Sequence, residues 1–221
     1  MPRKIIGAAF LSLDGVVQAP GALEEDRSGH FAHGGWLAPV ADESIDETIG
    51  PLFSRDFALL LGRRTYEIFA AYWPIIPMDD PIAAAFAKCE KFVLSRKGVA
   101  PDWQGSKHLA DLESLRAVKS GEGPDLIVQG SSTLNPQLLA AGLLDRLTLI
   151  IAPVVLGEGK RLFCEGTPPV TLKLVEQSVG SRGVITATYE PAGPVVPAAI
   201  GPEQMNPLER RRRERIAEGT W

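Results

Sequence analysis

The chain has 221 residues, of which 45% are hydrophobic and 23% are charged, and this ordinary globular composition excludes a wholly disordered protein. Its formal net charge of −4 supplies no overall attraction for nucleic acid or for an anionic membrane surface. No apolar run reaches the ~18 residues that span a bilayer, and the N-terminus lacks the long apolar region of a signal peptide. The two cysteines, Cys89 and Cys164, show no metal or redox spacing, so we expect a soluble cytoplasmic protein with reduced thiols.

Strand and helix signals alternate along the first half of the chain. Residues 4–12 are almost continuously apolar and β-prone, which is typical of a central strand covered on both faces. A glycine-rich, irregular stretch follows from Asp14 to Pro39, and a loop of this length in a compact domain is functional or disordered. Asp42 then begins a predicted helix with apolar residues at helical spacing. The next expected elements are a strand over 57–61, a short helix over 63–71 and a strand over 91–95.

The second half of the chain continues the alternation of strand and helix signals and then ends in two consecutive strand signals. Residues 171–179 and 184–190 are two β-prone segments separated by a glycine-containing turn, which predicts an antiparallel hairpin. Together these patterns predict an α/β fold with a mixed, mostly parallel sheet, a C-terminal antiparallel hairpin and helices on both faces. The elements expected before the hairpin are a helix over 111–119, a strand over 125–129, a helix over 134–141 and a strand over 146–153.

The composition shifts after Pro191. Five prolines occur from Pro191 to Pro207, and residues 208–216 then predict a short charged helix. We therefore expect one domain over residues 1–191 and a proline-rich tail over residues 192–221. The arginine run of this helix is interleaved with glutamates, which favours a solvated helix or an oligomer contact over nucleic-acid binding. Because the tail also holds many apolar residues, we expect it to pack along the domain or across a two-fold partner.

Three predicted strands lead directly into small, polar or basic residues. In open α/β sheets, ligands bind beyond the carboxyl ends of the strands, and helix N-termini present free N–H groups to phosphate. Each segment alone is typical of an ordinary strand–helix turn, but three together favour an anionic, nucleotide-like ligand. The chain has neither a Walker lysine motif nor a complete G-x-G-x-x-G fingerprint. The three segments are Leu61–Thr65, Val93–Lys97 and Val128–Thr133.

An ordered set of such segments resembles the dihydrofolate reductase-like superfamily. Within it, the chain is most similar to the reductase domain of riboflavin biosynthesis, the RibD C-terminal domain, and to its stand-alone relatives. The resemblance covers roughly residues 3–190 and implies a three-layer dihydrofolate reductase-like fold. The matching segments are Ser12–Gly15, Gly34–Trp36, Leu61–Glu67, Val93–Arg96, Gln129–Leu134, Gly142–Leu147 and Pro153–Gly159.

The resemblance implies NADPH as the cofactor. A 2′-phosphate adds about two negative charges, for which Arg96 and Arg64 are the expected counter-charges. Gln129 departs from the pattern, because many relatives have a further glycine there. The residues implied to hold the phosphates are Gly62, Arg63, Arg64 and Thr65; those implied beside the adenosine are Leu94, Ser95 and Arg96; and those implied at the pyrophosphate are Gln129, Gly130, Ser131, Ser132 and Thr133.

On the substrate side, the resemblance indicates the loop after the first strand and the helix that follows it. The candidate catalytic carboxylates are Asp14 and Asp46. Asp14 either contacts the substrate or orders a turn, and the acidic residues of the helix either support protonation or cap the helix. Trp36 and Phe53 are the candidate substrate-binding residues, although an aromatic residue beside a glycine pair also serves to anchor a loop.

The resemblance therefore implies an NADPH-dependent reductase that transfers hydride to a small conjugated heterocycle. The reaction would resemble that of dihydrofolate reductase or of 5-amino-6-(5-phosphoribosylamino)uracil reductase. The alternative is a non-catalytic NADPH-binding or regulatory protein. We expect no metal, because His30 and His33 lie on no helix that would align them and the family uses none. Relatives are commonly homodimers, so we expect a homodimer with a small-molecule substrate and with no nucleic-acid or membrane partner.

Overall fold

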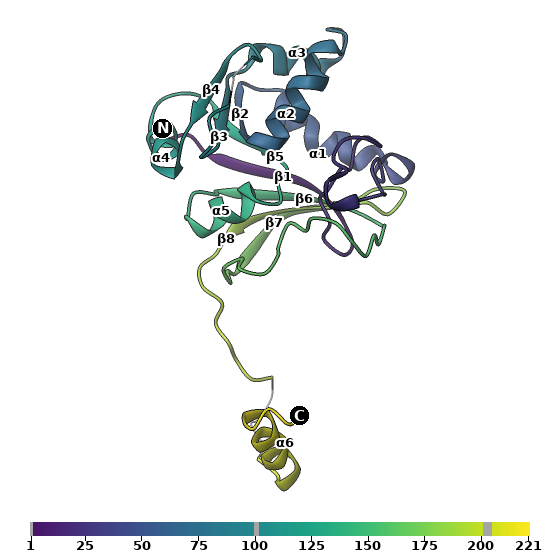
Figure 1. Ribbon diagram of the computed structural model, residues 1–221, viewed down its shortest axis with the longest axis vertical. Coiled ribbons are helices and arrows are strands. Elements are labelled where there is room, and N and C mark those ends of the chain that lie inside the picture. The colour runs from purple at the N-terminus through teal and green to yellow at the C-terminus, as the bar shows by residue number, and fades with distance from the viewer. Residues whose placement is uncertain (1, 100–101, 201–204) are drawn as a thin grey trace.

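An eight-stranded sheet forms the centre of the structure, a computed structural model that describes residues 2–99, 102–200 and 205–221 (Figure 1). Its strands follow the order β4-β3-β2-β5-β1-β6-β8-β7. The first six strands of this order run parallel to their neighbours, whereas β8 is antiparallel to both β6 and β7. The strands are β1 (Ile5–Ser12), β2 (Phe57–Gly62), β3 (Lys91–Leu94), β4 (Ser106–Leu109), β5 (Asp125–Gln129), β6 (Arg146–Ala152), β7 (Leu172–Val179) and β8 (Ile185–Pro191).

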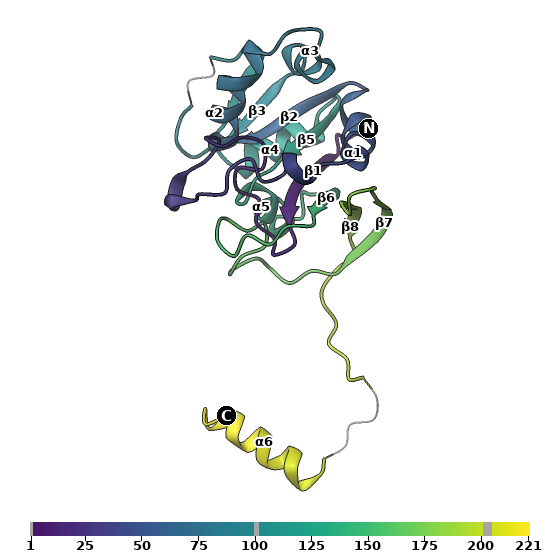
Figure 2. The ribbon, with the colours of Figure 1, turned by 90° about the vertical axis from the view of Figure 1, so that its right-hand side faces the viewer.

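Helices cover both faces of this sheet (Figures 1 and 2). Phe53 and Phe86 belong to an apolar cluster on the face covered by α1, α2 and α3, and Leu115 and Leu138 belong to the cluster under α4 and α5. The strand β1 contributes to both clusters, which explains its continuous apolar sequence. The expected three-layer α/β fold with its C-terminal hairpin is confirmed. The helices of the domain are α1 (Glu43–Phe53), α2 (Arg63–Tyr72), α3 (Pro81–Lys88), α4 (Leu112–Ser120) and α5 (Leu134–Ala140).

Aspartate side chains begin three of these helices. The Asp42 carboxylate accepts the Ser44 N–H at 3.2 Å, and Asp111 accepts the Ser114 N–H at 2.8 Å, as the sequence predicts for both helices. Asp80 caps α3 in the same way, but α3 and β4 were not predicted. β4 is a short edge strand of mostly polar residues, so it carries no apolar pattern. No helix in the described ranges is long and apolar enough to cross a bilayer.

The tail leaves the domain after its first residues. The Ala192 N–H donates to the Thr171 carbonyl at 2.7 Å, and the Thr171 N–H donates to the Gly193 carbonyl at 2.8 Å. From Val195 onward the described residues are almost all exposed, and α6 (Pro207–Ala217) buries none of its residues. Figure 2 shows α6 well apart from the sheet. The tail therefore does not pack along its own domain in this structure, where its apolar side chains are exposed; packing across a partner stays a prediction.

Candidate functional site

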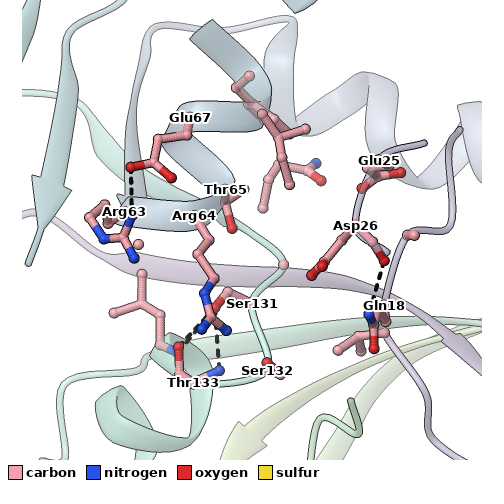
Figure 3. A pocket seen from close by; sticks show the side chains of 18 of the residues that line it. Gln18, Glu25, Asp26, Arg63, Arg64, Thr65, Glu67, Ser131, Ser132 and Thr133 are labelled. Carbon is pink, nitrogen blue, oxygen red and sulfur yellow. Dashed lines mark hydrogen bonds and ion pairs between the residues drawn. The ribbon is translucent and has the colours of Figure 1, made fainter. Parts of the chain in front are cut away.

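A cavity of about 1710 Å³ opens at the carboxyl ends of β2, β3 and β5 (Figure 3), and we call it the strand-end cavity. This volume exceeds the ~300–1,000 Å³ of a typical site for one small ligand, so the cavity has room for more than one. The twelve residues that the resemblance assigns to the cofactor all line it: Gly62, Arg63, Arg64, Thr65, Leu94, Ser95, Arg96, Gln129, Gly130, Ser131, Ser132 and Thr133.

The sheet register brings the three turns together. Gly62 pairs with Leu94 across β2 and β3, so the turns that follow these strands start side by side. A Cβ atom built on Gly62 would meet the Ser131 hydroxyl at 3.8 Å, and one on Gly130 would meet the Thr65 hydroxyl at 4.0 Å. The turns after β2 and β5 therefore face each other across a narrow gap, which the absence of both side chains keeps open for a ligand.

The turn after β5 depends on a glycine. Gly130 has a φ of +68°, which L side chains rarely adopt. Its N–H donates to the Ala8 carbonyl at 2.9 Å, and its own carbonyl accepts from the Asn135 side-chain amide at 2.6 Å. The Ser131 hydroxyl accepts the Thr133 N–H at 3.3 Å. These contacts hold the turn in place from both the sheet and α5, with the hydroxyl groups of Ser131 and Thr133 at the strand-end cavity.

Arginines supply the positive charge of this side. Arg63 turns away to pair with Glu67, with 2.6 Å between Nη1 and Oε1, whereas Arg64 extends toward Ser131 and Thr133 (Figure 3). Neither Arg64 nor Arg96 has an ion-pair partner among the residues that the structure describes. Two unpaired guanidinium groups at the end of parallel strands suit the separate phosphates of a dinucleotide.

Part of the lining of the strand-end cavity is apolar and aromatic, and we call this part the aromatic wall. Phe53 is fixed there by edge-on contacts with Phe57 and Phe86, at ring-centroid distances of 5.0 Å each. Such a wall accepts the face of a flat, weakly polar ring. Its residues come from β1, α1, α2, the turn after α2 and α3: Phe10, Ile49, Phe53, Ile68, Phe69, Tyr72, Trp73, Ile82 and Phe86.

The other sequence candidates on the substrate side lie elsewhere. Asp14 accepts hydrogen bonds from the Ser12 hydroxyl at 2.7 Å and from the N–H groups of Leu156 and Gly157 at 3.1 and 2.8 Å. The Ser12 hydroxyl, followed by the Leu156 N–H, holds the pKa of Asp14 far below its ordinary value. Asp14 does not line the strand-end cavity, so the structure favours its turn-ordering role over substrate contact.

Trp36 and Asp46 are also separate from the strand-end cavity. The Trp36 indole is buried against Val16 and Phe31 within the long loop, and its N–H donates to the Gln18 carbonyl at 2.8 Å. Asp46 lies exposed on α1. The structure therefore favours the loop-anchoring role for Trp36 and places Asp46 in solvent near the start of its helix, so it brings neither residue to the strand-end cavity.

Sequence reasoning missed the loop residues that do reach the strand-end cavity, among them Gln18, Glu25 and Asp26. The Gln18 amide is buried and donates to the carbonyls of Asp26 and Ser28, both at 2.9 Å. Lys160 from the segment after β6 pairs with the Asp26 carboxylate. No motif marks these residues, because their contacts lie within an irregular loop or, for Gln18 and Asp26, reach Lys160 more than 130 positions away.

The histidines and cysteines of the described residues form neither a metal site nor a disulfide. His33 lies with its Nε2 3.6 Å from Glu158 Oε1, and Cys89 is buried while Cys164 is exposed. Within the described ranges there is no group of three or more His, Cys, Asp or Glu residues that could hold a metal ion.

Comparisons with known proteins agree with this geometry. The model of the RibD C-terminal domain family matches residues 3–186. The uncharacterized protein YyaP of Bacillus subtilis (strain 168) is 31% identical over 194 residues, which are 85% of this chain and 94% of that protein. The uncharacterized protein YwjB of the same organism is 26% identical over 179 residues, covering 79% and 90%.

Solved structures share the fold. A protein of Shewanella sp. PV-4 assigned to riboflavin biosynthesis superposes with a TM-score of 0.62 at 20% identity, over 87% of this chain and 99% of that one. A pyrimidine reductase-like protein of Corynebacterium diphtheriae gives 0.55 at 16% identity, over 86% and 92%. Dihydrofolate reductase of Enterococcus faecalis, in complex with NADP(H), gives 0.50 at 18% identity, over 85% and 96%. The fold is therefore of the dihydrofolate reductase type.

Proposed function

Because the chain belongs to the RibD C-terminal domain family, we propose that it is an NADPH-dependent reductase of a small conjugated heterocycle. The observation that carries this proposal is the strand-end cavity itself. Its lining combines three strand-end turns, with two arginines that have no ion-pair partner among the described residues, and the aromatic wall. A site for a phosphorylated dinucleotide and a site for a flat ring therefore share one space.

The turns fit NADPH in charge and in shape. The first N–H groups of α2 lack a side-chain cap at Gly62, so they are available to a phosphate oxygen. Gly130 lets a phosphate approach the backbone closely, and Thr65, Ser131 and Thr133 offer hydroxyl donors. Arg64 and Arg96 would balance the extra charge of a 2′-phosphate. When bound, NADPH would supply a hydride, and the chain would orient the ring that receives it.

The aromatic wall favours a pteridine or folate-like ring over a phosphorylated riboflavin precursor. Outside the strand-end turns, the strand-end cavity is lined by one cation, Lys160, and this residue already pairs with Asp26 among the described residues. A phosphoribosyl group held against the wall would therefore have no unpaired arginine or lysine to meet it. A neutral bicyclic ring needs none, because it gains from burial between aromatic side chains.

The alternative, a protein that binds NADPH without using it, predicts a different result in the same experiment. NADPH oxidation is followed at its absorbance band with a panel of dihydrofolate, dihydrobiopterin and 5-amino-6-(5-phosphoribosylamino)uracil, alongside calorimetric titration of NADPH. We expect binding together with turnover of at least one unphosphorylated ring. Tight binding with no turnover across the panel favours the non-catalytic alternative, and absence of NADPH binding contradicts the cofactor assignment.

We also propose that the chain forms a homodimer. The sheet ends at β7, an edge strand whose residues are almost all exposed. Val179 on β7 and Ile185 opposite it on β8 are 71% and 40% exposed, so an apolar strip lies at this edge. Sedimentation of the full chain tests the proposal: a dimeric mass supports it and a monomeric mass contradicts it.

A further inference from the structure

Glu25 stands out among the residues of the long loop after β1. It lies at the strand-end cavity, on the side opposite Ser131 and Thr133 (Figure 3). Its Oε2 accepts the N–H groups of Gly21 and Ala22 at 2.7 and 3.1 Å, which fixes the carboxyl group on one oxygen. No hydrogen bond to Oε1 occurs among the described residues. The bonds to Oε2 therefore fix the carboxyl group, and Oε1 stays available to a ligand.

The other carboxylates at the strand-end cavity are already engaged. Glu24 pairs with Arg27 at 3.1 Å, Asp26 pairs with Lys160, and Glu67 pairs with Arg63 at 2.6 Å. Asp111 is bound as the N-cap of α4. Each of these carboxylates is therefore already bound to a partner of its own. Glu25 alone among the described carboxylates of this cavity has neither a cation nor a cap.

The surroundings of Glu25 favour its protonated form. Burial raises the pKa of Glu25 above its ordinary value, which outweighs the two N–H groups that lower it, and the charge of Asp26 raises it again. The nearest cations are engaged elsewhere: Arg27 with Glu24, and Lys160 with Asp26. Arg63 and Arg64 lie on the far side of the strand-end cavity (Figure 3). No charged group of these elements therefore offsets the burial of Glu25.

We propose that Glu25 is the proton donor of the reaction, an inference that rests on the proposed reductase function. Reduction of a ring C=N bond adds a hydride to carbon, as NADPH is oxidised to NADP⁺, and a proton to nitrogen. Glu25 breaks its O–H bond to give that proton, a new N–H bond forms on the ring, and the carboxylate then takes up a proton from solvent. The donor comes from the loop, not from α1, where the sequence suggested Asp46.

The test compares Glu25→Gln with Glu24→Gln in the full chain. The amide oxygen of Gln can still accept both loop N–H groups, so Glu25→Gln removes the proton and keeps the loop contacts. Glu24 is the matched control, because it is the adjacent carboxylate and its one ion-pair partner among the described residues is Arg27. We expect Glu25→Gln to lower kcat/KM for the ring that the unmodified protein reduces by at least ~100-fold. NADPH affinity and melting temperature stay unchanged in both variants.

Two further readouts separate proton donation from a merely structural role. For the unmodified protein, kcat/KM falls as the pH rises through the raised pKa of Glu25, because only the protonated form donates; Glu25→Gln loses this limb and Glu24→Gln retains it. In addition, ¹³C NMR of glutamate-labelled protein, assigned with the two variants, follows the Glu25 carboxyl without any substrate. We expect it to titrate above the ordinary pKa of a glutamate.

The outcomes distinguish the two proposals. Titration of Glu25 at or below its ordinary pKa, or a Glu25→Gln variant as active as Glu24→Gln, overturns the role of Glu25 and leaves the reductase function intact. An unmodified protein that binds NADPH but reduces no member of the panel overturns the reductase function and the donor with it. A raised NMR titration together with the selective loss of activity supports both.

Discussion

The two sides of the strand-end cavity are held in place by different means. The strand-end turns continue β2, β3 and β5, whose residues are buried in the sheet, so the core itself fixes their positions. The long loop has no strand or α-helix. It is held by polar side chains such as Asp14 and Gln18, by backbone hydrogen bonds to the segment around residues 154–162, and by a small apolar cluster that contains Trp36. A rigid side proposed for the cofactor thus faces a loop side that depends on contacts between distant segments of the chain. Substitutions should therefore act locally on the first side and through the loop on the second.

The largest effect is expected from a substitution in a strand-end turn of the rigid side. Gly130→Val places a β-branched residue at a φ of +68° and fills the gap in front of Thr65, so NADPH affinity should fall by at least ~100-fold. Gly142→Val is the matched control: Gly142 has a φ of +62° and does not line the strand-end cavity. Calorimetric titration measures both variants, with melting curves to show comparable strain. Equal NADPH affinity in the two variants would place the cofactor elsewhere.

This contrast also explains what the sequence could predict. The turns were predicted because each follows a run such as 57–61 or 125–129, where an apolar pattern fixes the strand and the strand fixes its end. Glu25, in contrast, reaches the strand-end cavity only because the loop folds back on the segment after β6. Such contacts leave no periodic signal. The alternatives for Asp14 and Trp36 stayed open for the same reason: the sequence shows a polar and an aromatic residue in a loop, but not which way the loop turns.

A smaller effect on cofactor affinity should distinguish Arg96 from Arg63, two arginines of the rigid side. Arg96→Ala should erase most of a preference for NADPH over NADH, lowering NADPH affinity about tenfold, or ~1.4 kcal/mol, and sparing NADH. Arg63→Ala serves as the comparison, because Arg63 is already paired with Glu67 and should contribute less. The dissociation constants of both cofactors are measured for each variant. A larger loss in Arg63→Ala than in Arg96→Ala would reverse the assignment of the 2′-phosphate.

On the loop side, Asp14→Ala should lower the stability of the fold and leave the affinity for NADPH unchanged. Losing the hydrogen bonds to Leu156 and Gly157 should lower the melting temperature by about 2–4 °C, the shift that ~1 kcal/mol gives in a domain of this size. Because the pKa of Asp14 is lowered in the fold, its contribution is present at neutral pH and is lost as the pH falls through that pKa. The difference from the unmodified protein should therefore shrink in acid.

The exposed Asp46 supplies the matched control for this measurement. Asp46→Ala should change the melting temperature less than Asp14→Ala, since Asp46 has no side-chain hydrogen bond among the described residues. An equal loss in the two variants would show that Asp14 is no more than a surface charge. A loss of NADPH affinity in Asp14→Ala alone would show that the loop also contributes to cofactor binding, contrary to the division between the two sides.

The smallest expected effect concerns the tail. Deleting residues 195–221 removes the exposed stretch and α6 but keeps the contacts of Ala192 and Gly193 with Thr171. The melting temperature of the domain should change by less than about 2 °C. A larger fall, measured at a concentration where the full chain is monomeric, would show that the tail packs on its own domain. A fall seen only where the full chain is dimeric would place the tail across the partner.

The central claim is that the strand-end turns hold NADPH, and titration of the unmodified protein tests it most directly. Calorimetry with NADPH and with NADH, under identical buffer and salt, gives both dissociation constants without any substrate. Two unpaired arginines at the strand-end cavity predict saturable binding of NADPH at least ~tenfold tighter than NADH. Equal affinities, or no binding of either dinucleotide, would contradict the account.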